Sequence, residues 1–187
     1  MNIVEPIRDR RIIENIKKLL KESNIRDYLL FVLGINTGLR VSDLLKLKTK
    51  DVSIGKHILD VVYITEKKTG KTKKFVLNKS CKEALKEYLN ITKLIPGQYL
   101  FKSRKGDHPI DRTQAYRIIN NVARKVGIED HIGTHTLRKT FGYHARKQGV
   151  SIELLQKVFN HSAPSITMRY LGITQDEINE VYSYVNL

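Results

Sequence analysis

Residues 134–170, THTLRKTFGYHARKQGVSIELLQKVFNHSAPSITMRY, contain the starts and stops of several helices within one short stretch. A first helix is expected to follow Thr134 and to run to Gln148, after which a glycine ends it. Ser151 has the position of an N-cap for a second helix that ends at Phe159. After a short turn, Pro164 is typical of the first residue of a third helix. The stretch therefore predicts consecutive helices joined by tight turns.

Helical periodicity also precedes this stretch. Apolar residues recur at steps of three and four over residues 12–20 and 25–33, which predicts two helices with buried faces. A short helix is expected over residues 37–45. Two longer helices are expected to begin at Ser80 and Asp111, each followed three residues later by Glu or Gln in the capping-box position.

Residues 58–78 have a different character. Residues 58–65 and 73–78 are rich in β-branched and aromatic side chains, and Gly70 lies in the turn between them, so the segment predicts a β-hairpin. The sequence as a whole predicts a mainly helical α+β fold with a small antiparallel β-sheet at one edge of the helices. We expect residues 1–187 to form a single domain.

The charge of the chain indicates a polyanionic partner. The 187 residues include 34 Lys or Arg and 19 Asp or Glu, a formal net charge of +15, which favours double-stranded DNA. Residues 40–79 alone hold eleven Lys or Arg and four acidic residues. No apolar run approaches the roughly 20 residues of a membrane span. Cys81 is the single cysteine, so we expect a cytoplasmic protein with no disulfide and no cysteine-based zinc site.

Six polar residues could together perform chemistry on a phosphodiester, although each taken alone has an ordinary structural explanation. They are Arg40, Lys68, His135, Arg138, His161 and Tyr170. Two arginines can bind the non-bridging oxygens of a phosphate and stabilise the charge of its transition state. A tyrosine can serve as the nucleophile, a histidine can assist its deprotonation, and a lysine can protonate the leaving 5′ oxygen. This set requires no metal ion and no cofactor.

The segments that carry these residues resemble the catalytic domain of the tyrosine recombinases, also called phage integrases, from residue 8 to the end of the chain. They are Thr37-Gly-Leu-Arg-Val-Ser-Asp43, Lys68-Thr-Gly, His135-Thr-Leu-Arg138 and His161-Ser-Ala-Pro-Ser-Ile-Thr-Met-Arg-Tyr170. The resemblance implies a site-specific DNA recombinase that uses neither metal nor ATP.

The resemblance also implies a role for each residue of the set. Arg40 and Arg138 would be the arginine pair, and Lys68 the general acid on the hairpin. His135 and His161 would contact the phosphate. Tyr170 would form the 3′-phosphotyrosine link.

The chain departs from the family pattern at three places. Asp43 stands where Glu is common, Lys139 where His is frequent, and Phe159-Asn160 where Leu-Gly is usual. Because Asn tolerates the left-handed conformation that Gly would supply, we expect the turn after Phe159 to be retained. Many members of the family carry an N-terminal helical domain that closes around DNA, and we expect no such domain here.

Further candidate residues concern partners. Lys71 and Lys73 on the hairpin and Arg112 on the helix after Asp111 are expected to contact DNA. Residues 171–187 contain three acidic residues and no Lys or Arg. Thr174 and the residues after it have the pattern of a helix with one apolar face. That tail packs either on its own domain or, as the resemblance implies, on a neighbouring protomer of a tetramer assembled on DNA.

Two other functions are compatible with parts of this pattern. A type IB topoisomerase would use similar tyrosine chemistry to relax DNA, and a non-catalytic DNA-binding accessory protein would account for the charge. The motif strings favour a recombinase, and the complete set of catalytic residue types argues against a degenerate site. The chain has no His-Glu-x-x-His string and no phosphate-binding loop of the Gly-x-x-x-x-Gly-Lys type.

Overall fold

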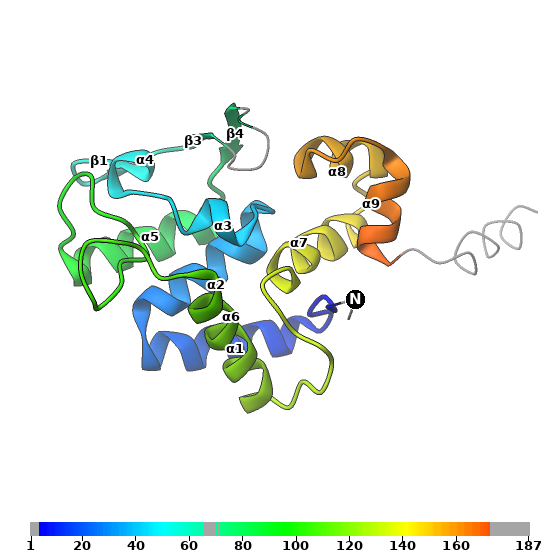
Figure 1. Cartoon of the computed structure of the whole chain (residues 1–187), viewed down its shortest axis with the longest axis horizontal. Helices are drawn as coiled ribbons and strands as arrows, with labels where there is room; N and C mark the ends of the chain where they lie inside the picture. Colours follow the sequence, from blue (N-terminus) through cyan, green and yellow to red (C-terminus); the bar gives the residue numbers. More distant parts are fainter. Residues whose placement is uncertain (1–3, 66–69, 71, 173–187) are drawn as a thin grey trace, which may run out of the picture. The chain divides into compact units, whose positions relative to one another are not determined.

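The computed structural model describes residues 4–65, 70 and 72–172 (Figure 1). Its elements are α1 (Arg10–Ser23), α2 (Ile25–Thr37), α3 (Val41–Leu44), α4 (Thr49–Val52), β1 (Ser53–Ile54), β2 (His57–Ile58), β3 (Val61–Thr65), β4 (Thr72–Val76), α5 (Lys79–Thr92), α6 (Arg112–Lys125), α7 (Thr136–Lys147), α8 (Ile152–Phe159) and α9 (Pro164–Leu171). The chain divides into two compact units, Met1–Phe141 and Gly142–Leu187, and the boundary falls within α7. Among the described residues, no helix has the length and apolarity needed to cross a membrane.

The core of the first unit is built around α2. This helix packs against α1 and α5, and α1 also contacts α6 (Figure 1). The consecutive residues Leu29 to Leu33 are each at most 1% exposed, so the middle of α2 is apolar on every side, as expected of a helix enclosed by others. Asn24 ends α1 and caps α2, because its side chain accepts hydrogen bonds from the backbone N–H groups of Arg26 and Asp27.

The β structure differs in detail from the expected single hairpin. In the part of the chain that the structure describes, two separate antiparallel pairs form, β1 with β2 and β3 with β4. Ile58, expected in the same strand as Thr65, instead pairs with Ser53 across a turn at Gly55. The N–H of Leu59 donates to the carbonyl of Val52. Leu59 and Asp60 lie between β2 and β3, so the two strand pairs are separate. The hairpin of β3 and β4 is present as predicted, and it packs Val62 and Phe75 inward.

The second unit contains the end of α7 followed by α8 and α9. Gly142 lets these elements approach closely, because a Cβ there would lie 2.8 Å from Phe159 and 2.5 Å from Leu171. The predicted cap is present at Ser151, whose hydroxyl accepts from the N–H of Leu154. Asn160 ends α8 at φ 50° and ψ 49°, so the left-handed turn expected at this position is confirmed.

Candidate active site

The turn between α2 and α3 positions two of the predicted arginines: it contains Arg40, and its backbone binds Arg138. Gly38 ends α2 at φ 62°, and a Cβ there would lie 2.9 Å from the ring of Phe141. The carbonyl of Gly38 accepts a 2.7 Å hydrogen bond from Nη1 of Arg138, whose side chain is buried. Arg40 follows two residues later as the N-cap residue of α3 and is half-buried. The hydrogen bond from the guanidinium of Arg138 to the backbone of this turn therefore holds Arg138 near Arg40.

His135 joins this cluster from the turn that precedes α7. The N–H of Gly133 donates to the hydroxyl of Thr136, and the N–H of Thr136 donates back to the carbonyl of Gly133, so the turn is fixed at both ends. His135 is exposed as a residue, and desolvation of the covered part of its ring lowers its pKa. The positive charges of Arg112, Arg138, Arg40 and Lys139 lower this pKa further, in that order. The imidazole is thus favoured in its neutral form.

Lys139 is a buried cation next to Arg138. It is 6% exposed, and burial is the main cause that lowers the pKa of its ammonium group. Thr140 beside it accepts a hydrogen bond from the N–H of Ile7, which ties the N-terminal segment to α7. The family's frequent His is thus replaced by a lysine in an enclosed position.

The second unit holds the other two predicted residues together. Nδ1 of His161 lies 3.0 Å from the hydroxyl of Thr167, which is fully buried. The rings of His161 and Tyr170 have their centroids 5.3 Å apart and stand nearly edge to face at 71°. The ring of Phe159 lies 5.5 Å from that of Tyr170 and 5.3 Å from that of His161. The three rings therefore pack against one another, and the phenol of Tyr170 contacts both the histidine and the buried phenylalanine.

The predicted site residues thus form two groups, each described within its own unit. Arg40, His135 and Arg138 meet in the first unit, and His161 and Tyr170 meet in the second. Lys68 and Lys71 lie outside the described residues.

Lys73 is described, and it has a specific place on the hairpin. It is half-buried opposite Ile64, on the inward face of β3 and β4, whereas its neighbour Lys74 pairs with Tyr63 on the exposed face. The role of Lys73 in DNA binding stays a prediction.

Three residues that matter to the site were missed in the sequence. The carbonyl of Gly38 anchors Arg138, Thr167 orients His161, and Phe159 packs on Tyr170. Thr167 lies inside the His161–Tyr170 string, so the string itself contained the signal for it. The bond between Gly38 and Arg138 joins residues 100 positions apart, and nothing local indicates it.

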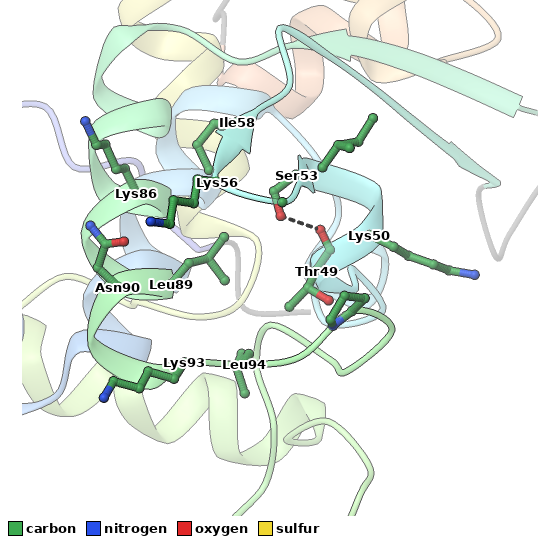
Figure 2. Close-up of a pocket in the computed structure, with 13 residues that line it drawn as sticks. Thr49, Lys50, Ser53, Lys56, Ile58, Lys86, Leu89, Asn90, Lys93 and Leu94 are labelled. Carbon is green, nitrogen blue, oxygen red and sulfur yellow. Dashed lines mark hydrogen bonds between the residues drawn. The ribbon is translucent and has the colours of Figure 1, made fainter.

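A cavity in the first unit lies away from the predicted catalytic residues in the sense that none of them lines it. It measures about 560 Å³ and is lined by α4, β1, the end of α5 and the loop that follows. Figure 2 shows Lys56, Lys86 and Asn90 toward one side of it, Leu89 and Leu94 among the other lining residues, and the hydrogen bond from Ser53 to the carbonyl of Thr49. None of the six predicted catalytic residues lines it. Among the described residues, no group of three or more His, Cys, Asp or Glu side chains is placed to hold a metal ion.

Residues 8–177 match the sequence profile of the phage integrase family. The chain belongs to this family. It is 47% identical over 182 residues to the probable integrase/recombinase YoeC of Bacillus subtilis (strain 168), with 97% of each chain covered. It is 31% identical to tyrosine recombinase XerA of Pyrococcus furiosus over 93% of this chain and 60% of that protein. The chain therefore spans nearly all of YoeC but about three fifths of XerA.

Solved structures of tyrosine recombinases share the fold of this family member. The crystal structure of XerA recombinase aligns with a TM-score of 0.77 at 23% identity, over 96% of this chain and 65% of that one. The post-cleavage complex of XerH with palindromic difH substrate aligns with a TM-score of 0.76 at 21% identity, over 97% and 53%. Together the comparisons confirm the predicted family, the mainly helical α+β fold class and the classification as a recombinase.

Proposed function

We propose that this phage integrase family member cleaves and rejoins duplex DNA at specific sites through a covalent link between Tyr170 and a 3′ phosphate. The observation that carries the proposal is the 2.7 Å bond from Arg138 to the carbonyl of Gly38, two residues before Arg40. It supports a preformed pair of guanidinium groups, and such donors stabilise the charge that develops on a phosphate in the transition state.

In the proposed reaction, Oη of Tyr170 attacks the scissile phosphorus and loses its proton to a histidine. The bond to the 5′ oxygen breaks, and Lys68 supplies the proton that this oxygen needs to leave as a hydroxyl. Rejoining is the reverse: a 5′ hydroxyl attacks the phosphotyrosine and Tyr170 leaves. The covalent link retains the energy of the phosphodiester, so strand exchange needs no metal ion and no nucleotide cofactor.

The proposal assigns different tasks to the two histidines. His135 lies with Arg40 and Arg138 in the first unit, which suits a ring N–H of its imidazole to contact the phosphate. His161 lies against Tyr170 and is held by Thr167, which suits it to align the nucleophile and contact the phosphate. Both tasks require the imidazole rings to keep their observed orientation.

The partner that we propose is double-stranded DNA, supported by the net charge of +15 and by the DNA complex of the structural relative XerH. Assembly as a tetramer on DNA is part of the proposal, with residues 171–187 as the docking segment; residues 173–187 lie outside the described residues. A cytoplasmic location stays a prediction, to be tested by cell fractionation.

The decisive experiment captures covalent protein–DNA adducts. The full chain is incubated with a pool of nicked random duplexes, linked DNA is recovered and sequenced, and the modified peptide is mapped. We expect the adduct on Tyr170, and Tyr170→Phe should abolish it while DNA binding persists. Tyr143→Phe is the matched control, because Tyr143 lies on α7 outside the His161–Tyr170 string. An adduct on another tyrosine, or none at all, would overturn the proposal.

The same preparation separates the proposed function from DNA relaxation. Products that join strands from two different duplexes identify a recombinase, and relaxation of a supercoiled circle without exchange identifies a topoisomerase. Arg40→Ala and Arg138→Ala should each slow cleavage by about 100-fold or more, because each removes a transition-state donor.

A further inference from the structure

A chain of buried hydrogen bonds connects the N-terminal segment, residues 4–7, to the turn that carries His135. The N–H of Ile7 donates a 2.9 Å bond to Oγ1 of Thr140, 133 positions away. The same hydroxyl donates a 2.8 Å bond to the carbonyl of Thr136. Oγ1 of Thr136 in turn accepts a 3.0 Å bond from the N–H of Gly133. The N-terminal segment is therefore linked, through two threonines, to the residues on either side of His135.

The two hydroxyls of this chain lie out of reach of water. Thr136 and Thr140 are 0% and 1% exposed, and Ile7 is 3% exposed. A hydroxyl that bonds to the carbonyl four residues earlier is ordinary within a helix. The bond from Ile7 is not, because it uses a lone pair of Thr140 to hold a segment outside the helix. Loss of the Thr140 hydroxyl would leave a buried N–H without this partner, which is costly.

Two further contacts hold the N-terminal segment against the loop that precedes α7 (Figure 1). The N–H of Glu5 donates a 2.9 Å bond to the carbonyl of His131. Cγ1 of Val4 lies 3.0 Å from the position that a Cβ would take on Gly133, so the segment occupies the space that a side chain there would need. The N-terminal segment therefore covers residues 131–133 and ends at the bond to Thr140.

The helix turn that ends at Thr140 also carries Arg138. Nη1 of Arg138 is bonded to the carbonyl of Gly38. The first four N–H groups of a helix have no partner within it, so the position of a helix start depends on contacts with other segments. The start of α7 has such contacts with Gly133, Gly38 and Ile7. All of them lie within the first unit.

We propose that Thr140 is a positioning residue of the reaction, and that the N-terminal segment belongs to the scaffold of the active site. The bond from that segment to Thr140 fixes the first turn of α7, so that His135 and Arg138 reach one phosphate together. This inference rests on the proposed function and gives a role to residues that supply no catalytic group. Thr140 is too deeply buried to touch DNA and acts through His135 and Arg138. Its removal should slow cleavage without weakening the binding of DNA.

The variants are chosen to separate positioning from stability. Thr140→Val keeps the shape of the side chain and removes its hydroxyl, whereas Thr140→Ser retains the hydroxyl. Thr140→Cys, whose thiol is a weak acceptor, gives a milder form of the same test if Thr140→Val does not fold. Thr49→Val is the matched control, because Thr49 is 3% exposed and its Oγ1 likewise accepts from an N–H, that of Gly97, and donates to a carbonyl, that of Ile95. Thr49 lines the cavity that none of the predicted catalytic residues lines.

The first test compares stability with cleavage in the full chain. The midpoint of urea denaturation should fall by similar amounts in Thr140→Val and Thr49→Val. The rate of adduct formation at Tyr170, measured at saturating DNA where every variant is folded, should fall about tenfold or more in Thr140→Val and not in Thr49→Val. The DNA concentration that gives half of the maximal rate should stay unchanged. Thr140→Ser should restore most of the rate.

The second test needs neither DNA nor activity. The ring signals of His135 are observed by NMR in the full chain with isotopically labelled His and are assigned with His135→Gln. Because the turn before α7 loses its fixed position, Thr140→Val should shift or broaden these signals, whereas Thr49→Val should leave them unchanged. Exchange of the Ile7 amide proton with solvent should also be faster in Thr140→Val.

The outcomes distinguish a positioning role from a purely stabilising one. Equal losses of cleavage in Thr140→Val and Thr49→Val would overturn the inference, because lost stability would then account for the effect. Unaltered His135 signals in Thr140→Val, a loss of cleavage that Thr140→Ser does not restore, or weaker DNA binding as the sole defect would also overturn it. A wild-type chain that forms no adduct refutes the proposed function instead, and the NMR result still decides whether Thr140 positions His135.

Discussion

Substitution of Gly38 by Ala should destabilise the first unit more than the same change at another left-handed glycine. Gly38 has φ 62°, and an added Cβ would lie 2.9 Å from Cδ1 of Phe141. The left-handed conformation costs an L-residue about 1–2 kcal/mol, and overpacking costs about a further 1–3 kcal/mol. The free energy of unfolding should therefore fall by about 2–5 kcal/mol, less a few tenths gained because alanine restricts the unfolded chain.

Gly127 provides the matched control for this prediction. It has φ 81°, and nothing lies within 4 Å of the position of an added Cβ. Gly127→Ala should therefore show the conformational cost alone, and the difference between the two variants isolates the contact with Phe141. Urea denaturation followed by far-ultraviolet circular dichroism measures both. Phe141→Leu should reduce the loss in Gly38→Ala and leave that in Gly127→Ala unchanged.

The substitution at Gly38 should also affect cleavage, because its carbonyl holds Arg138. A displacement of this turn misplaces the guanidinium, and small misplacements of catalytic groups reduce rates by about 10-fold to 100-fold. Equal losses of stability in Gly38→Ala and Gly127→Ala would refute the packing argument. Full cleavage activity in a folded Gly38→Ala chain would refute the assignment of this turn to the active site.

Three further predictions each concern one residue: Thr167, Asn160 and Lys139. Thr167→Val should retain DNA binding and slow adduct formation about tenfold, because the hydroxyl 3.0 Å from Nδ1 of His161 is lost; an unchanged rate in the capture assay would contradict this. Asn160 has the left-handed φ of 50°, so Asn160→Ala should lower the free energy of unfolding by about 1 kcal/mol, whereas Asn160→Gly should not. Equal denaturation curves for the two variants would contradict a backbone strain at this position. Burial lowers the pKa of Lys139 below its ordinary value of 10.5, so the unfolded chain binds more protons and the free energy of unfolding should rise as the pH approaches 10.5. Lys139→Met should weaken this rise when unfolding is measured as a function of pH. An unchanged slope of the free energy against pH would refute the prediction.

The sequence allowed good prediction of structure wherever the determining contacts are local. Asp111 and Ser151 cap their helices through bonds to the N–H three residues later, and Pro164 begins α9. The cap at Ser80 was wrong, because Asn78 accepts from the N–H of Cys81 instead. The helix expected to follow Thr134 begins at Thr136, so His135 lies in the turn bonded to Gly133 and not on the helix as expected.

Elements that depend on tertiary contacts were predicted less well. A two-residue strand has no periodicity of its own, so the pairing of β1 with β2 could not be expected from the sequence. In the site, the residue types and their order identified the candidate set, but not how each is held. The anchoring of Arg138 by the carbonyl of Gly38 and the hydrogen bond from Asn120 of α6 to the carbonyl of Ile132 both join distant segments. Such long-range contacts determine how the predicted residues are placed, and the sequence alone does not reveal them.

The cluster in the first unit combines burial with a concentration of cations, and this links its stability to its proposed chemistry. Arg138 and Lys139 are 3% and 6% exposed, and Arg40, Arg112 and Lys139 all act on His135 with the same sign. Removing cations from water is costly unless an opposite charge or hydrogen bonds compensate. The bond to Gly38 supplies one such hydrogen bond to Arg138, and a bound phosphodiester would supply the opposite charge. In the proposed reaction, the same positive charges that lower the pKa of His135 would also favour the anionic transition state at the phosphate.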